Sequence, residues 1–394
     1  MSQATAVDLL ILGGGCAGLS LARELAQRDT QASVRVIEPR EAYEDDRSWC
    51  FWAANDQRLF DGVGHTWAAW LFNVEGQPRQ ARSCPGYSYQ YVRAKDFYRL
   101  CQEAITGSSH VLLQLGESVT DLQPHAAGWR VTTSRGEYLA TQVVDTRPPL
   151  PQVLKQSTLF QCFLGVEILL DSPVERADAV ELMTDMRLLY GEFCFTYVLP
   201  HSERHLLAEV TVFSREPWSR EALIPELHRL LAQRGWVGAE VLKTEYGLLP
   251  MGLPESAEGS EGPLSAGKQL LIAGTRGGAL RASSGYGFLR IQRWAEACAK
   301  QYVANNTLAP AGAGAGARAG YWLPRMDKLF LAVLKRYPHV TPTLFDRLLS
   351  RASAERFIRF MDDRATVVDC LQIVACLPKR LFLKTLLSMV WKRQ

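Results

Sequence analysis

The sequence predicts an α/β protein in which a parallel-sheet domain is interrupted by an antiparallel α+β insert and followed by a helical C-terminal region. Three observations favour this class. Residues 7–38 show a strand, a glycine loop, a helix and a second strand, and residues 160–213 alternate as antiparallel strands do. The residues after Trp322 have helical periodicity. The chain has 394 residues, 47% of them hydrophobic, which is enough for two or three domains.

The elements of the first unit follow from hydrophobicity. VDLLIL at 7–12 is typical of a buried strand, residues 18–28 place leucine and alanine at helical spacing, and VRVIE at 34–38 predicts a second strand. Residues 96–106 predict another helix, and residues 111–145 predict further strands with a hairpin. A strand–helix–strand unit of this kind is typical of a Rossmann-like domain.

A G-x-G-x-x-G motif joins the first strand to the first helix. The residues that we expect to contact a dinucleotide there are Gly13, Gly15, Cys16, Ala17, Gly18 and Glu38. The first glycine permits a tight turn, the second lets a pyrophosphate approach the helix N-terminus, and the third allows close helix packing. The acid at the end of the second strand is placed to bind ribose hydroxyls. The motif therefore predicts dinucleotide binding.

A second glycine-rich stretch, AGTRGGALRASSGYGFL, follows a short predicted strand at 269–273. The residues of this stretch that we expect to hold a cofactor are Gly274, Arg276, Gly285, Tyr286 and Gly287. Glycines let the backbone approach a flat ring closely. Two such stretches far apart in one chain indicate a long cofactor held at both ends, which favours FAD. A helix is expected from near Gly285 to Trp294.

The residues between the glycine stretches predict the antiparallel insert, with one helix at 220–235. From these patterns we divide the chain into functional regions. They are an FAD-binding domain of residues 1–150 and 265–305, substrate-binding portions of residues 40–95 and 151–264, a flexible Gly/Ala loop at 306–321 and a helical, basic, membrane-facing region at 322–394.

Charge is spread unevenly along the chain. The net charge is +3, but the segment from Arg325 to the end has 14 Lys and Arg against 6 Asp and Glu, so it carries +8. Its last part, PKRLFLKTLLSMVWKRQ, mixes basic and large apolar residues, as does a helix lying in a membrane interface. An ordinary amphipathic packing helix explains the same pattern equally well. No nucleic-acid recognition motif is present, so we expect no nucleic-acid partner.

The compartment is predicted from three further features. The apolar runs are too short to span a bilayer, and the N-terminal run leads directly into a glycine loop, as a first strand does rather than a signal peptide. Nine cysteines without a CxxC pair fit a reducing cytoplasm, and no metal site is expected. We therefore expect a cytoplasmic protein associated peripherally with the inner face of the membrane.

Two segments carry candidate catalytic residues. In EDDRSWCFW at 44–52, Trp49 and Phe51 could offer π faces to a carbocation, and Asp46 could take part in proton transfer. A solvated loop followed by core aromatics is the alternative. In HLLAEVTVFS, Glu209 interrupts an apolar strand, and alternation places it on one face with Leu207. Burial would raise its pKa, as a general acid requires, whereas a solvent-facing glutamate is the alternative.

The chain resembles the bacterial lycopene β-cyclases, FAD-dependent enzymes of carotenoid synthesis. The motifs that carry the resemblance, in chain order, are GGGCAG after the first strand, Trp49 with Phe51, YVLP and LLAEVT at 197–211, EYGLLPMG at 245–252, GTRGG at 274–278 and SGYG at 284–287. Flavoprotein hydroxylases and reductases usually carry Gly-Asp in the second loop. Here Thr275 and Arg276 follow the glycine, which agrees with the cyclase pattern.

The resemblance implies a reaction without net redox. Reduced FAD, with NAD(P)H as the electron source, would stabilise a carbocation while linear ψ ends of lycopene close to β rings, giving γ-carotene and β-carotene. It assigns Glu209 as proton donor, with Trp49 and Phe51 assisting, and places Arg93 near the adenine. It also implies a membrane surface and other carotenoid enzymes as partners. The alternatives are an FAD-dependent isoprenoid reductase or hydroxylase, a cyclase for another polyene, and a non-catalytic flavin-binding membrane protein.

Overall fold

The first sheet is built around the N-terminal strand and is mainly parallel. The computed structural model describes residues 4–57, 60–125, 128–253, 269–310 and 322–391. The strands of this sheet, in spatial order, are β8 (Val111–Leu115), β2 (Val34–Glu38), β1 (Thr5–Leu12), β11 (Glu137–Asp145), β10 (Gly128–Thr133) and β9 (Val119–His125), with β17 (Gln269–Ile272) beside the end of β11. Only β9 and β10 are antiparallel to their neighbours.

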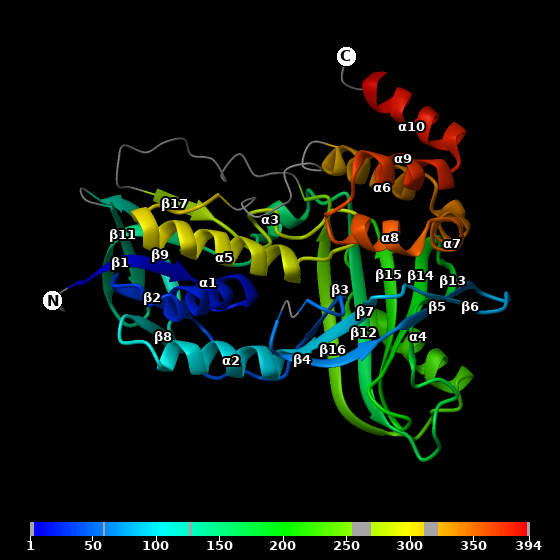
Figure 1. Ribbon diagram of the computed structural model, residues 1–394, viewed down its shortest axis with the longest axis horizontal. Coiled ribbons are helices and arrows are strands. Elements are labelled where there is room, and N and C mark those ends of the chain that lie inside the picture. The colour runs from blue at the N-terminus through cyan, green and yellow to red at the C-terminus, as the bar shows by residue number, and fades with distance from the viewer. Residues whose placement is uncertain (1–3, 58–59, 126–127, 254–268, 311–321, 392–394) are drawn as a thin grey trace.

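Three helices form a layer against this sheet. Helix α1 (Cys16–Gln27) packs between α2 (Ala94–Thr106) and α5 (Phe288–Asn305), as Figure 1 shows. Leu19, Leu21 and Leu25 of α1 are fully buried, because the sheet, α2 and α5 together enclose the helix. Helix α5 begins after Gly287 and extends eleven residues beyond Trp294, the end expected from the sequence.

The second sheet is almost wholly antiparallel. Its strands in spatial order are β16 (Glu240–Met251), β12 (Leu159–Leu169), β15 (His205–Ser214), β14 (Glu192–Pro200), β13 (Ala179–Leu189), β5 (Ala69–Val74) and β6 (Gln80–Ser83). Helix α4 (Arg220–Gln233) covers its outer face, where Leu206, Ala208 and Val210 of β15 pack. A small sheet of β3 (Ser48–Ala54), β7 (Tyr87–Arg93) and β4 (Val63–Trp67) lies between the two large ones (Figure 1), and α3 (Pro151–Leu154) follows β11.

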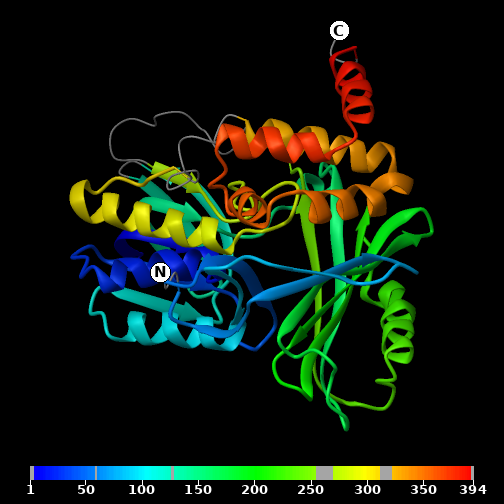
Figure 2. The ribbon, with the colours of Figure 1, turned by 45° about the vertical axis from the view of Figure 1, so that its right-hand side comes forward.

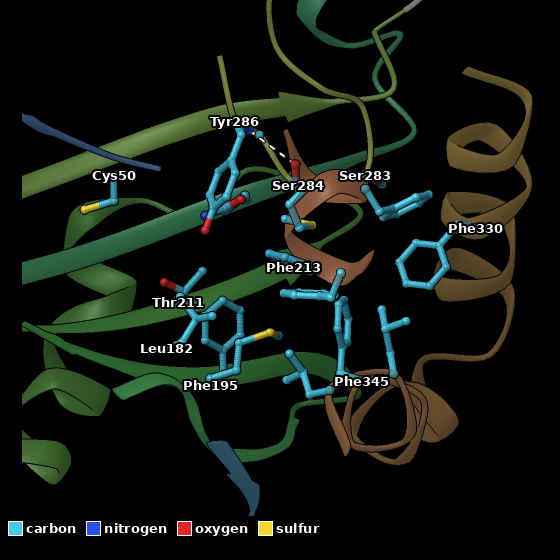
Figure 3. A pocket seen from close by; sticks show the side chains of 18 of the residues that line it. Cys50, Leu182, Phe195, Thr211, Phe213, Ser283, Ser284, Tyr286, Phe330 and Phe345 are labelled. Atoms are coloured by element: carbon cyan, nitrogen blue, oxygen red, sulfur yellow. Dashed lines mark hydrogen bonds between the residues drawn. The ribbon is translucent and has the colours of Figure 1, made fainter. Parts of the chain in front are cut away.

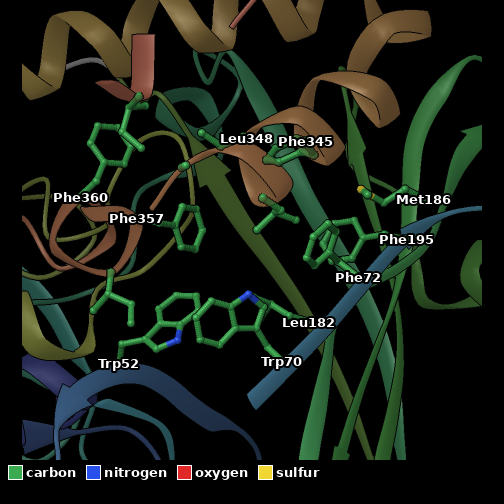
Figure 4. Close-up of a cluster of buried hydrophobic side chains, with 14 of the residues drawn as sticks. Trp52, Trp70, Phe72, Leu182, Met186, Phe195, Phe345, Leu348, Phe357 and Phe360 are labelled. Atoms are coloured by element: carbon green, nitrogen blue, oxygen red, sulfur yellow. The ribbon is translucent and has the colours of Figure 1, made fainter. Parts of the chain in front are cut away.

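The C-terminal region forms a cap over the inner face of the second sheet. Its helices are α6 (Leu323–Arg336), α7 (Thr341–Arg351), α8 (Ala354–Met361), α9 (Val367–Cys376) and α10 (Lys379–Trp391), with a short 3₁₀ turn at Pro338–Val340. Phe345 and Leu348 of α7 and Phe357 of α8 pack against Trp52 and Phe195 in one buried cluster (Figure 4). Helix α10 projects away from the body in Figure 2.

The predicted fold class is confirmed: a Rossmann-type parallel sheet, an antiparallel insert and a helical C-terminal region are all present. Of the predicted Gly/Ala loop at 306–321, residues 311–321 lie outside the described residues, as do residues 126–127 of the predicted hairpin. Within the part of the chain that the structure describes, no helix is both long and apolar enough to cross a membrane.

Candidate active site

The first glycine loop is a tight turn with open space at the start of α1. Gly13 has φ +97°, a backbone conformation that favours glycine. A Cβ atom on Gly18 would lie 2.0 Å from the carbonyl oxygen of Gly13, so only glycine allows this approach. A Cβ atom on Gly15 would meet nothing within 4 Å. Cys16 and Ala17 form the first turn of α1, which has no acidic residue. The helix N-terminus therefore suits a phosphate group.

The carboxylate of Glu38 lies beside this loop. Glu38 is 4% exposed at the end of β2 and accepts hydrogen bonds from the Gly14 N–H at 2.7 Å and from Arg40 Nε at 2.7 Å. The guanidinium of Arg40 lies over two rings, 4.8 Å from the centroid of Tyr43 and 5.5 Å from that of Tyr98. Sequence motifs did not single out Arg40, Tyr43 or Tyr98, because no fixed spacing relates these residues to a glycine loop.

The second glycine stretch meets the first. Gly274 has φ +65°, and a Cβ atom there would lie 3.3 Å from the Cβ atom of Ala17 in the first turn of α1. Arg276 donates to Asp145 Oδ2 at 2.9 Å, which ties the stretch to the end of β11. Gly285, with φ +72°, faces the second sheet. The fold thus brings together two glycine stretches that are far apart in sequence, as a cofactor held at both ends requires.

A mostly apolar cavity of about 310 Å³ lies between the second glycine stretch, the inner face of the second sheet and the cap. The polar residues and glycines in its lining include Ser48, Cys50, Tyr89, Gln161, Tyr197, Glu209, Thr211, Glu245, Ser283, Ser284, Gly285, Tyr286, Gly287 and Asp327. From the cap, the side chains that line it include Phe330, Phe345, Phe360, Val374, Leu377, Lys379 and Phe382. Figure 3 shows Tyr286 and Ser284 facing Phe195, Thr211 and Phe213 across this space. The cavity therefore extends from the glycine stretch to α10.

Glu209 faces this cavity from the middle of β15. Alternation along the strand turns Leu206, Ala208 and Val210 toward α4 and leaves Glu209 on the inner face, 8% exposed. Its Oε1 accepts a hydrogen bond from the Thr211 hydroxyl at 2.8 Å. Burial and, next, the charge of Glu245 raise the pKa of Glu209 to about 8, so it holds a proton at neutral pH. A carboxyl of this kind can act as a general acid.

Three tyrosine hydroxyls form a chain along the same cavity. The Tyr89 hydroxyl lies 2.8 Å from that of Tyr197 and 2.9 Å from that of Tyr286, which belongs to the second glycine stretch. Burial raises the pKa of Tyr89 and Tyr197 well above the usual value, so both stay neutral. Tyr197 is the residue directly opposite Glu209 on the neighbouring strand. The chain of hydroxyls therefore borders the buried acid.

Phe51 lines a smaller pocket together with Tyr286 and Gly287. This side chain is 4% exposed, stacks on Phe288 with centroids 5.4 Å apart, and does not line the large cavity. Trp49 does line the cavity, and so does Trp52, whose ring centroid lies 4.6 Å from that of Tyr89. Nearly every residue of β3 is apolar, so the sequence pattern did not reveal which of its aromatic rings face the cavity.

Asp46 and Arg93 lie outside the lining of the large cavity. Asp46 accepts a hydrogen bond from Tyr98 at 3.0 Å, near the first glycine loop, and does not line the cavity. The guanidinium of Arg93 pairs with Asp45 and, at 3.1 Å, with Glu167 of the second sheet. The adenine contact expected of Arg93 and the proton transfer expected of Asp46 stay predictions.

The cysteines offer no reactive thiol at this site. Burial raises the pKa of Cys16 and of Cys50 to about 12, so both thiols are protonated and poor nucleophiles. All nine cysteines are free. Among the described residues, no group of three or more His, Cys, Asp and Glu side chains is arranged to hold a metal ion.

Comparison with known proteins identifies the family. Residues 8–387 match the family model described as lycopene cyclase protein. A curated lycopene beta-cyclase from Pseudescherichia vulneris is 29% identical over 258 residues. That alignment covers 62% of this chain and 62% of the relative, so the chain matches less than two thirds of the relative's length.

Solved structures with a similar fold include flavoproteins of other activities. A geranylgeranyl bacteriochlorophyll reductase-like protein from Thermoplasma acidophilum has a TM-score of 0.57 and 13% identity, with 97% of this chain and 99% of that chain covered. A probable FAD-dependent monooxygenase from Pseudomonas aeruginosa has a TM-score of 0.53 and 14% identity, with 84% and 96% covered. At these identities the likeness shows the fold alone.

Proposed function

The chain belongs to the lycopene cyclase family, and from that premise we propose that it closes the linear ψ ends of lycopene to β rings, giving γ-carotene and β-carotene. The reaction is an intramolecular cyclisation without net redox that uses reduced FAD. The observation that carries the proposal is a buried, protonated carboxyl, Glu209, facing a mostly apolar cavity. Such a cavity suits a hydrocarbon chain, and a carboxyl that holds its proton at neutral pH can start the chemistry of that chain.

The first step is a proton transfer from Glu209 to the terminal C1=C2 bond of the substrate. The proton forms a new bond at C2 and leaves a tertiary cation at C1, while Glu209 becomes a carboxylate. The C5=C6 bond then closes onto C1, and loss of a proton from C6 restores a double bond between C5 and C6. The substrate gains and loses one proton, so the product is an isomer.

The side chains around Glu209 are suited to protect a cation from water. Trp52 and Tyr89 offer aromatic faces inside the cavity, and such faces attract a cation by about 0.5–2 kcal/mol each. The cap helices close the cavity with Phe330, Phe345 and Phe360. Because the aromatic rings and phenylalanine side chains are poor bases and poor nucleophiles, they favour ring closure of the cation over its capture.

The two glycine stretches fit FAD. Gly15 leaves the start of α1 accessible to a pyrophosphate, Glu38 and Arg40 border the expected ribose position, and Gly285 and Gly287 line the cavity where a ring system would lie. When bound in its reduced form, with NAD(P)H as the electron source, FAD supplies negative charge that stabilises the cation. Arg276 pairs with Asp145 and so holds the second stretch in position.

An assay with purified protein, lycopene in liposomes, FAD and a reductant tests this function. We expect γ-carotene and β-carotene to form only when the flavin is reduced, while NAD(P)H is consumed in much less than one equivalent per ring. The readouts are the pigment spectrum and chromatography. A fixed ratio of NAD(P)H oxidised to product would identify a reductase or hydroxylase instead, and cyclisation only of neurosporene or γ-carotene would identify another polyene as substrate.

We also propose that the protein extracts its substrate from the inner face of the cytoplasmic membrane through α9 and α10. Exposed apolar side chains on these helices include Val367, Val368, Leu371, Leu383, Leu386, Leu387, Val390 and Trp391. Lys379 and Phe382 of α10 and Val374 of α9 also line the cavity. The cavity therefore reaches the same surface, and a carotenoid could pass from the bilayer without entering water.

Leu387→Ser combined with Trp391→Ser is expected to weaken binding to anionic liposomes at least tenfold. These side chains are 54% and 80% exposed, and burying a large apolar side chain contributes about 1.5–3 kcal/mol. Co-flotation of the protein with liposomes measures the effect. Val237→Ser, at a residue 73% exposed in the loop after α4, is the matched control and should float as the wild type does. Unchanged flotation of the double variant would remove the proposed role of α10.

A further inference from the structure

A second glutamate lies in the same row of the sheet as Glu209. In the antiparallel register, Glu209 of β15 is directly opposite Gly165 of β12, and Gly165 is directly opposite Glu245 of β16. Residues directly opposite each other on antiparallel strands place their side chains on the same face. Both glutamates accordingly line the cavity.

Gly165 leaves the space between the two glutamates without a side chain. A Cβ atom there would lie 3.2 Å from the Cβ atom of Glu209. Adjacent strands are about 4.8 Å apart, so the backbones of Glu209 and Glu245 are separated by about 10 Å, within the combined reach of two glutamate side chains. The charge of Glu245 contributes to the raised pKa of Glu209, as expected for carboxyls that interact across this gap.

The two carboxyls have different partners. Glu245 lies 3.5 Å from the ammonium group of Lys243, and its Oε1 accepts a hydrogen bond from the Ser48 N–H at 3.1 Å. Among the described residues, the carboxyl of Glu209 accepts one side-chain hydrogen bond, from the Thr211 hydroxyl at 2.8 Å. A cation and a backbone N–H stabilise a carboxylate far more than a neutral hydroxyl does. Burial raises the pKa of both carboxyls, but within the described part of the chain only Glu245 has a cation and a backbone N–H beside it to offset that effect. Of the pair, we therefore assign the negative charge to Glu245 and the proton to Glu209.

We propose that Glu245 is the catalytic base that removes the proton from C6 of the cyclised cation. This inference rests on the proposed lycopene cyclisation. The C6–H bond breaks, its electron pair becomes the C5=C6 double bond, and the proton joins the carboxylate of Glu245. A proton then passes from Glu245 to the carboxylate that Glu209 became in the first step. Both groups return to their initial states, and the reaction consumes no acid or base.

The position of the base also determines the ring type. The cyclic cation at C5 has protons on C4, on C6 and on the attached methyl group, and only loss from C6 gives a β ring. Loss from C4 would give an ε ring. The carboxylate of Glu245 is held on a rigid sheet, in the same row of directly opposite residues as the proton donor. From this fixed position it can reach one of these protons selectively. Glu245 is thus a specificity-determining group as well as a base.

Glu245→Gln tests the inference. Glutamine keeps the shape and can still accept from the Ser48 N–H, but it cannot take a proton. With lycopene in liposomes and reduced FAD, we expect kcat to fall about 10²-fold or more with little change in KM, because deprotonation slows and binding does not. We also expect rings with a displaced double bond to appear among the products. Chromatography and the pigment spectrum resolve these isomers, which a merely structural change would not produce.

Two further variants complete the test. Glu245→Asp keeps the negative charge, but its side chain is shorter by one methylene, so the carboxylate lies farther from the substrate. The cyclisation rate and isomer ratio of this variant should therefore fall between those of the wild type and Glu245→Gln. Glu226→Gln, on α4 and paired with Arg187, is the control and should cyclise as the wild type does. Suppose that the wild type forms β rings. Glu245 is then not the base if Glu245→Gln forms them at the wild-type rate. It is also not the base if Glu245→Gln forms them more slowly but with an unchanged isomer ratio. If the wild type does not cyclise lycopene, the proposed function itself fails.

Discussion

Glu209→Gln is expected to lower the rate of lycopene cyclisation by about 10²–10⁴-fold while the protein still folds and binds flavin. Glutamine has the same shape as glutamate and can still accept a hydrogen bond from the Thr211 hydroxyl, but it has no acidic proton to donate to C2 of the substrate. The other polar groups of the cavity do not replace it. Tyr89 and Tyr197 are much weaker acids, because burial raises the pKa of both hydroxyls well above the usual value.

The measurement is the initial rate of γ-carotene formation in liposomes, with flavin absorbance as the check on folding. Glu226→Gln, at a partly buried acid outside the cavity, is the control. The pH profile of the wild type provides an independent check. Because the protonated form of Glu209 is the active one and its pKa is about 8, the rate should decline as the pH rises through that value. If Glu245 is the base, the rate should also decline at lower pH, where its carboxylate takes up a proton. A Glu209→Gln variant that cyclises lycopene at the wild-type rate would show that another group is the acid.

The hydrophobic pattern was sufficient to predict the first unit and to predict which side chains share a face with Glu209. The strand expected at 34–38 coincides with β2, and the helix expected at 18–28 agrees with α1 apart from its first turn. On β15, strict alternation separates the residues that pack on α4 from those that face the cavity. These features are local, since one strand or one helix turn fixes which side chains share a face.

The partners of Glu209 could not be predicted, because they depend on pairing between distant segments. Glu245 joins its row only through the register of β16 on β12, and the importance of Gly165 appears only once both neighbouring strands are in place. The aromatic strand β3 was ambiguous for a related reason. With apolar residues on both faces, its sequence does not reveal that Trp52 lines the cavity whereas Phe51 packs on Phe288.

Arg281 provides the clearest case of a residue whose role only the fold reveals. It belongs to the second glycine stretch but is 1% exposed, and its guanidinium pairs with Asp327 of α6 at 3.1 Å and with Asp363, just after α8, at 3.7 Å. It also donates to the backbone carbonyl of Phe360 in α8. One buried cation thus joins the loop that precedes Gly285 to two helices of the cap, and it fixes the position of the second glycine stretch relative to the cap.

Arg281→Met is therefore expected to destabilise the protein by about 3–5 kcal/mol, because it leaves Asp327 and Asp363 buried without this cation. The free energy of unfolding, measured with urea, tests this expectation. Arg99→Met is the control. Arg99 lies on α2 with its side chain 53% exposed and paired with Glu103, and the loss of such a surface pair costs at most about 1 kcal/mol. Equal losses for the two variants would mean that the buried cation does not hold the cap. A large loss confined to Arg281→Met, accompanied by a lower cyclisation rate, would show that the position of the cap over the second glycine stretch depends on this one side chain.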